Sequence, residues 1–177
     1  PRFDYSGGAS CPSLLLEPSR TQLIGHSEYL EGSSWTSTGL TLTPNSATSP
    51  SGLQNAYLAT NGDGNQKYII PSVSITDNTD YTYSVFVKKG NQNIYQIKIF
   101  NSDFSESLQL AFDFSNPQSP TITDGVTGGS YLDSDVKDFG NGWYRIELSF
   151  TSFDTSLNIR NYIGTANGTD NSTMYYY

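Results

Sequence analysis

The chain has 177 residues, a length typical of one domain with a sizeable core, so we do not expect a two-domain enzyme. Its formal net charge at pH 7 is −8, and this negative field repels the phosphate groups that supply most nucleic-acid affinity, so no nucleic-acid partner is expected. Only 15% of the residues are charged and 14% are aromatic. The polar residues are mainly Ser, Thr, Asn and Gly, a mixture that disfavours helices, while Thr, Tyr and Phe suit a pleated sheet. The composition therefore predicts an all-β fold.

Cysteine and histidine are too scarce for several common kinds of site. Cys11 is the single cysteine and cannot form an intrachain disulfide, and His26 is the single histidine, so no Cys/His cluster can hold zinc. No run of about 18 apolar residues is present, and we expect no membrane partner. His26 has no nucleophile at a recognisable spacing, and no phosphate-binding glycine motif occurs. The sequence therefore predicts that the chain is not an enzyme.

The N-terminal segment differs from the rest of the chain. Residues 1–20 contain three prolines and a glycine pair around the apolar triplet Leu14–Leu16, which predicts an extended arm over residues 1–26. The leucines have little local structure to bury them, so we expect the arm to pack on the sandwich or on a neighbouring subunit of a homo-oligomer. The start at Pro1 and the strand-like end at Tyr177 favour the interpretation that the sequence is a piece of a longer protein.

From residue 27 to residue 177, turn residues separate short β-rich runs. Five runs alternate apolar and polar residues clearly: 81–88, 94–100, 108–114, 144–151 and 157–163. Weaker strands are predicted at 38–43, 54–60, 66–70 and 173–177. Alternation with one polar face is typical of antiparallel sheets buried on one side. We therefore predict an antiparallel two-sheet jelly-roll sandwich. Its expected core consists of Tyr83, Val85, Val87, Ile97, Ile99, Leu110, Phe112, Ile146, Leu148, Phe150, Ile159 and Ile163.

One glycine-rich loop offers oxygen ligands. Asn61, Asp63 and Asn65 alternate with glycines, and carboxylate and amide oxygens are the ligands that Ca²⁺ prefers. A structural calcium ion is one interpretation of this loop. Solvated turn residues are the other, and no further cofactor is expected.

Aromatic residues interrupt polar strand faces at three positions: Phe86, Phe100 and Tyr162. A sugar ring can lie on an exposed aromatic face while flanking polar groups bond its hydroxyls. Nearby on the same predicted faces, Arg145 and Arg160 offer forked donors and Glu147 an acceptor. These residues form the predicted glycan-binding face. The alternative is that the rings are covered by the arm or by a partner subunit.

Four parts of the N-terminal region resemble a segment that recurs in bacteriophage tail-fibre and other virion-surface proteins. They are the opening Pro1–Tyr5, the segment Cys11–Thr21 and the pairs Ser27-Glu28 and Trp35-Thr36. The runs 81–88 and 140–146 look like the body of the same module, which is similar to carbohydrate-binding modules of the galactose-binding-like jelly-roll group. Gln22 stands where Asn is more usual, and a Trp-Gly-Ala-Gln-like segment after the last strand is missing.

The resemblance implies a non-catalytic adhesion module on the virion surface, most simply in a tail fibre, that recognises host surface glycans. It also implies other virion subunits as partners, with a trimer as the common assembly of such fibres. Two alternatives remain open: a purely structural capsid decoration or fibre spacer, and a binding module of a polysaccharide-degrading enzyme.

Overall fold

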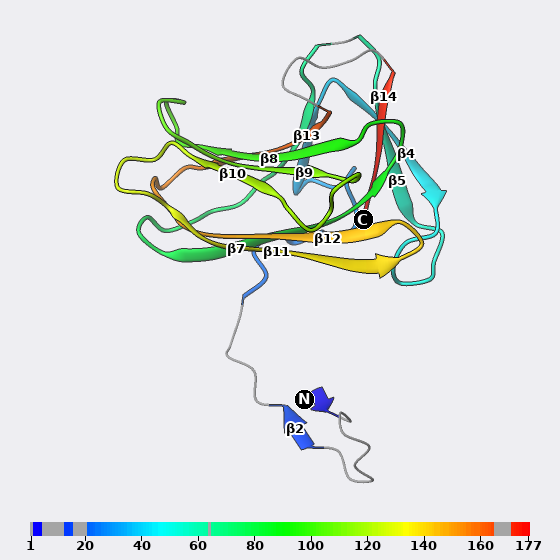
Figure 1. The fold of residues 1–177 in the computed structure, drawn as a ribbon, viewed down its shortest axis with the longest axis horizontal. Helices are drawn as coiled ribbons and strands as arrows, with labels where there is room; N and C mark the ends of the chain where they lie inside the picture. Colours follow the sequence, from blue (N-terminus) through cyan, green and yellow to red (C-terminus); the bar gives the residue numbers. More distant parts are fainter. Residues whose placement is uncertain (1, 5–12, 16–20, 64, 165–170) are drawn as a thin grey trace.

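A computed structural model describes residues 2–4, 13–15, 21–63, 65–164 and 171–177. These residues form strands and turns, and none of them is helical. Two six-stranded antiparallel sheets stack face to face (Figure 1). Sheet I has the order β10 (Thr121–Asp124), β9 (Ser107–Asp113), β8 (Ile94–Phe100), β13 (Asn158–Ile163), β6 (Tyr68–Pro71) and β3 (Trp35–Thr38). Sheet II has the order β11 (Tyr131–Gly140), β12 (Trp143–Thr151), β7 (Asp80–Lys89), β14 (Ser172–Tyr176), β5 (Ala56–Asn61) and β4 (Leu40–Ala47).

The chain passes repeatedly between the two sheets. Hairpins within one sheet, such as β4–β5 and β11–β12, alternate with crossings such as β6 to β7 and β12 to β13. In Figure 1, β8, β9 and β10 lie in one layer and β7, β11 and β12 in the layer below it. The predicted all-β, antiparallel two-sheet jelly-roll sandwich is confirmed.

The core lies between the two sheets and follows the alternation of the sequence. Every residue of the predicted core is buried, and Ile97, Leu110 and Leu148 are fully inaccessible to solvent. The five clearly alternating runs coincide with β7, β8, β9, β12 and β13 to within one or two residues. The period of two therefore identified the inward faces correctly.

Four strands of the sandwich depart from the prediction. The expected strand at 38–43 divides at Gly39, whose φ of +74° breaks it into β3 and β4. The strands β10 and β11 were not predicted. Most side chains of β11 are exposed, because this strand lies at the outer edge of sheet II and needs no regular apolar face.

The N-terminal segment contains a small sheet of its own. The strands β1 (Arg2–Asp4) and β2 (Ser13–Leu15) pair with each other, so the arm has more ladder structure than predicted. Ile24, inside the predicted arm, packs against the sandwich core, and Trp35 Nε1 donates a hydrogen bond of 2.8 Å to the His26 carbonyl. Cys11 and Leu16 lie outside the described residues.

A polar cluster sits inside the otherwise apolar core. Asn161 on β13 is buried, and its Oδ1 accepts hydrogen bonds from the hydroxyls of Tyr83 (3.0 Å) and Tyr95 (2.5 Å). Its Nδ2 donates to the carbonyl of Ile69 at 3.0 Å. Burial raises the pKa of both Tyr83 and Tyr95, so both phenols stay protonated and can donate. One amide thereby joins β7 of sheet II to β6, β8 and β13 of sheet I.

Across the part of the chain that the structure describes, no helix of the length and apolarity needed to span a membrane is found.

Candidate functional site

The residues predicted to bind a glycan divide between two sheets. Phe86, Arg145 and Glu147 lie on β7 and β12 of sheet II, whereas Phe100, Arg160 and Tyr162 lie on β8 and β13 of sheet I. The sheets stack on each other, so their outward surfaces face opposite ways (Figure 1). The prediction of one continuous binding face is therefore wrong, because alternation along a strand says which residues point outward but not to which sheet the strand belongs.

The sheet II group is brought together by strand pairing. Phe86 and Arg145 are directly opposite each other on β7 and β12, and the guanidinium lies 6.0 Å from the Phe86 ring centre. Arg145 Nη1 forms an ion pair with Glu147 Oε1 at 2.7 Å, and Arg145 Nη2 donates to Ser84 Oγ at 3.4 Å. These contacts hold the arginine side chain across the strands and leave its charge locally balanced.

Two further aromatic rings join this group. Phe139 on β11 packs edge-to-face against Phe86, with 4.9 Å between the ring centres. The ring centre of Tyr177 lies 6.0 Å from that of Phe86. Phe139 is 49% exposed, so part of its ring faces solvent. Neither residue was predicted, since Phe139 lies in the irregular edge strand β11 and Tyr177 follows the last strand.

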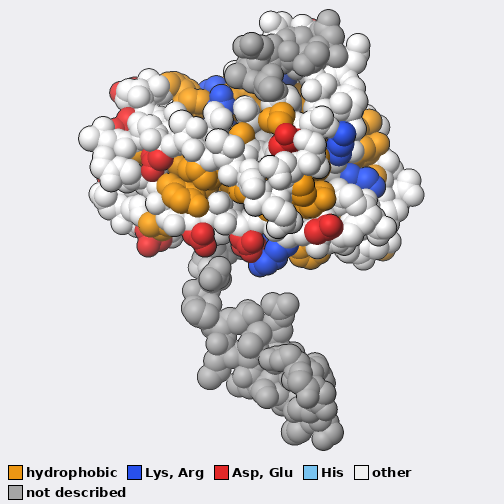
Figure 2. All heavy atoms as spheres, viewed as in Figure 1, with side chains coloured by type: hydrophobic (Ala, Val, Ile, Leu, Met, Phe, Trp, Pro, Cys, Tyr) orange, Lys and Arg blue, Asp and Glu red, His pale blue; other side chains and the backbone are white. Residues whose placement is uncertain are grey.

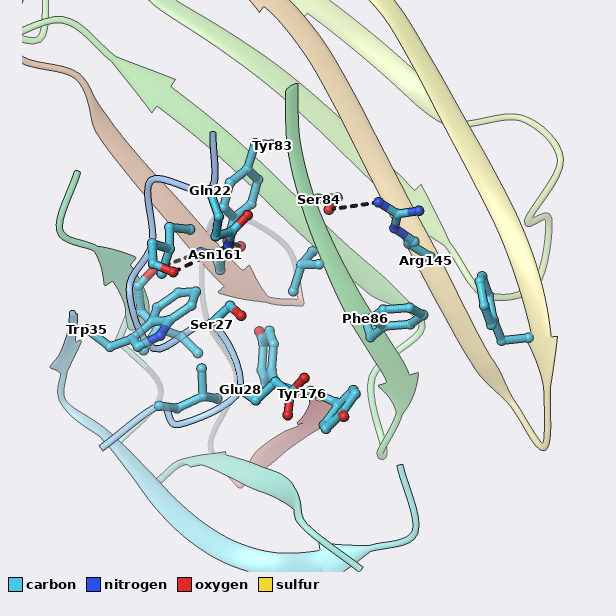
Figure 3. A pocket seen from close by; sticks show the side chains of 16 residues that line it. Gln22, Ser27, Glu28, Trp35, Tyr83, Ser84, Phe86, Arg145, Asn161 and Tyr176 are labelled. Carbon is cyan, nitrogen blue, oxygen red and sulfur yellow. Dashed lines mark hydrogen bonds between the residues drawn. The ribbon is translucent and has the colours of Figure 1, made fainter. Parts of the chain in front are cut away.

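A cleft of about 490 Å³ opens beside these rings (Figure 3). Phe86, Phe139 and Tyr177 provide an aromatic part of its lining. The exposed side chains of Gln22, Ser27 and Glu28 come from the segment that leads into the sandwich, and Ser84 and Arg145 come from sheet II. Figure 3 shows Phe86 and Arg145 on one side of the cleft and Gln22, Ser27 and Trp35 on the other. Aromatic faces with polar groups around them suit a neutral, hydroxyl-rich ligand.

The sheet I group has a different structure. The Arg160 guanidinium lies 4.3 Å from the Tyr68 ring centre, 5.1 Å from that of Phe100 and 4.8 Å from that of Phe104. Phe104, which was not predicted, is 50% exposed and has a left-handed backbone with φ of +62°. The arginine therefore serves as a packing centre for rings as well as a donor.

Tyr162 does not have the exposed ring that the prediction requires. It points away from the core as expected, but only 2% of its surface is exposed. Tyr68 packs edge-on against it at 5.1 Å between ring centres, and Lys98 Nζ lies 5.4 Å from its ring centre. Burial raises the pKa of Tyr162 and lowers that of Lys98. Outward-facing neighbours thus cover a ring that the sequence places on the polar face.

In the loop considered for calcium, the side chains form hydrogen bonds with the backbone of the loop itself. Asn61 Oδ1 accepts from the amide of Asp63 (3.3 Å), Asp63 Oδ1 accepts from the amide of Asn65 (3.1 Å), and Asn61 Nδ2 donates to the Asn65 carbonyl (2.7 Å). Asp63 Oδ2 also pairs with Lys67 Nζ at 3.1 Å. The Asn65 amide and Lys67 lower the pKa of Asp63. Within the described ranges, no group of three or more His, Cys, Asp or Glu side chains could hold a metal. Calcium at Asn61, Asp63 and Asn65 stays a prediction, and the observed contacts match the turn interpretation.

The cleft of sheet II is the candidate site, because it combines partly exposed rings with fixed donors and acceptors. Neither family models nor curated proteins give a match to this chain.

Proposed function

We propose that the chain is a non-catalytic binding module that recognises glycans in the cleft beside Phe86 and Phe139. The observation that carries the proposal is the pair of edge-to-face rings next to Arg145. The C–H groups of a pyranose can lie on the exposed part of Phe139, while Arg145 and Ser84 reach its hydroxyls.

The electrostatics favour a neutral sugar. The chain carries a net charge of −8, which opposes the approach of a polyanionic glycan. The cation inside the cleft, Arg145, is already paired with Glu147, so it offers hydrogen bonds more than net charge. We therefore propose neutral pyranosides, rather than uronates or sulfated sugars, as the ligand class.

The setting is proposed from the sequence resemblance alone. On that basis the module belongs to a bacteriophage virion surface, most simply a tail fibre, with other virion subunits as partners and a homo-oligomer, such as a trimer, as its assembly.

A purely structural spacer is the second candidate. The covered ring of Tyr162 favours it, because a ring that the sequence places on the polar face of sheet I is packed under Tyr68 and offers no platform.

The two candidates differ in the effect of removing one exposed ring. We expect Phe139→Ala to weaken binding of neutral oligosaccharides about fivefold or more, since a lost stacking contact is worth about 1 kcal/mol. Phe104→Ala is the matched control, because Phe104 is 50% exposed and lies near sheet I. Ligands are selected on a glycan array, and affinities are then measured by isothermal titration calorimetry.

If Phe139→Ala binds the sugar with unchanged affinity and Phe104→Ala binds it more weakly, the glycan site lies on sheet I and not beside Phe139. An array on which the unmodified protein binds no glycan would favour the spacer. Thermal unfolding of both variants should stay close to that of the unmodified protein, because each ring is about half exposed.

A further inference from the structure

Two cations lie directly opposite each other on the outer face of sheet I. Lys98 on β8 and Arg160 on β13 are register partners, and both are half-buried. Both point away from the core, because Ile97 and Ile159, their neighbours along the strands, are buried in it. Like charges directly opposite on neighbouring strands are destabilising. An anion bound between them would therefore stabilise the pair.

Within the described part of the chain, no carboxylate pairs with either cation. Three other cations form ion pairs with acidic side chains at 2.7 to 3.1 Å, whereas Lys98 and Arg160 form none. The register partner of Lys98 on its other side is the neutral Gln109 of β9. Acidic side chains gather along the lower rim in Figure 2, where β11 of sheet II lies in Figure 1. The pair is thus a local positive site in a chain with a net charge of −8.

The Arg160 guanidinium is held in place and still has a free donor. Its Nε donates to Asn158 Oδ1 at 2.8 Å, and its Nη1 donates to the Tyr162 hydroxyl at 3.3 Å. The guanidinium also lies 4.3 Å from the Tyr68 ring centre. Among the described residues, neither Arg160 Nη2 nor Lys98 Nζ forms a hydrogen bond. These two nitrogens are therefore the donors available to an anion.

A half-exposed ring lies beside the arginine. Phe104 is in the loop between β8 and β9, with its ring centre 4.8 Å from the Arg160 guanidinium. Its φ of +62° is unusual for a bulky residue. Asn101 fixes the loop, because its carbonyl accepts from the Phe104 amide (3.3 Å) and its Oδ1 from the Glu106 amide (3.0 Å). Such a backbone persists only where its surroundings impose it, so the loop holds this ring next to the cation pair.

Two carboxamides flank Lys98 on the same face. Gln109 is its register partner on β9, and Gln96 precedes it by two residues on β8. In the described ranges neither side chain forms a hydrogen bond, and Gln96 Oε1 is buried without a partner. A buried acceptor without a donor is unfavourable. A ligand with hydroxyl groups would supply the missing donor.

We propose that the outer face of sheet I binds a uronic acid residue, with its carboxylate between Lys98 and Arg160. The carboxylate oxygens accept hydrogen bonds from Lys98 Nζ and Arg160 Nη2. The C–H groups of the pyranose ring lie on Phe104, and its hydroxyls bond to Gln96 and Gln109.

This site is separate from the cleft of sheet II and takes a different class of sugar. The arginine of the cleft is already paired with a carboxylate, whereas the two cations of sheet I are not. The net charge of −8 opposes a polyanionic chain, but a single carboxylate here contacts two positive groups. One acidic residue in an otherwise neutral glycan fits both conditions.

The test compares methyl β-D-glucuronide with methyl β-D-glucoside, which has a hydroxymethyl group in place of the carboxylate. Affinities are measured by NMR from the backbone amides of β8, β9 and β13, which distinguishes this site from the cleft. We expect the glucuronide to bind about tenfold more tightly or better, because charge-assisted hydrogen bonds are about twice as strong as neutral ones. Burial lowers the pKa of Lys98, and the bound carboxylate should raise it, because an anion favours the charged amine.

Three results would refute the proposal. They are equal binding of the two sugars at these amides, no shift of these amides with the glucuronide at millimolar concentration, and acetate binding as tight as that of the glucuronide. The last result would show that the sugar ring and its hydroxyls contribute nothing.

Lys98→Met removes the charge and keeps an unbranched side chain. Lys137→Met is the matched control, because it changes the net charge equally but lies on β11 of sheet II. We expect Lys98→Met to weaken glucuronide binding about tenfold. Lys137→Met should change it less than about twofold, because salt screens charges beyond about 8 Å at physiological ionic strength. Equal losses in the two variants would mean that only the overall charge matters and would contradict the site.

Aromatic variants separate this site from the cleft. Phe104→Ala should weaken glucuronide binding about fivefold, as expected for one lost stacking contact. Phe139→Ala should leave glucuronide binding unchanged, because Phe139 lies on sheet II. The reverse result would place the acidic sugar in the cleft and overturn the proposal. Loss of neutral-sugar binding alone in Phe139→Ala is the result expected if both sites exist.

Discussion

Replacing Leu148 by Ala is expected to lower the free energy of unfolding by about 2–5 kcal/mol, the usual range for a fully buried leucine. Leu148 lies on β12, has no exposed surface, and pairs with Tyr83 of β7 on one side and Ser134 of β11 on the other. The shortened side chain leaves a cavity between the sheets that neighbouring strands can close only in part. Urea denaturation followed by fluorescence measures the change.

Leu132→Ala is the matched control. Leu132 lies on the neighbouring strand β11 and is 51% exposed, so its replacement should change stability by no more than about 0.5 kcal/mol. Equal losses in the two variants would show that the inward and outward faces near β11 and β12 are assigned incorrectly.

The sequence predicts the central strands better than the edge strands, for a physical reason. β7, β8, β9 and β12 lie inside their sheets, and one face of each packs on the core, so their residues must alternate. β11 lies at an edge, and its charged residues oppose strand addition instead of marking a buried face. The alternation of apolar and polar residues therefore does not reveal β11 in the sequence.

The candidate site was predictable only in part. Phe86 and Arg145 are both identifiable as outward residues, and the antiparallel pairing of β7 and β12 brings them together. Their separation from Phe100 and Arg160 depends on which sheet each strand joins, which is decided by contacts between strands far apart in the chain. Phe139, the ring that packs against Phe86, could not be predicted because its strand, β11, shows no regular alternation of buried and exposed residues.

The buried amide of Asn161 shows a further limit of pattern reading. Ile159, Asn161 and Ile163 lie on the same side of β13, but a polar residue among inward apolar ones gives no sign of its partners. The phenols that bond to it come from Tyr83 and Tyr95, on strands of different sheets. Only the stacked sheets bring these groups within hydrogen-bond distance.

Asn161→Ala should accordingly destabilise the protein by about 3 kcal/mol or more, because each buried polar group left without a partner costs roughly 1–3 kcal/mol. The substitution removes the acceptor of the Tyr83 and Tyr95 hydroxyls and the donor to the Ile69 carbonyl. Tyr83→Phe is the comparison, since it removes one hydroxyl and leaves the amide bonded to Tyr95 and Ile69, so a loss of about 1 kcal/mol is expected. Urea denaturation of both variants gives the two values. A loss in Asn161→Ala no larger than that in Tyr83→Phe would mean that the amide does not hold the two sheets together.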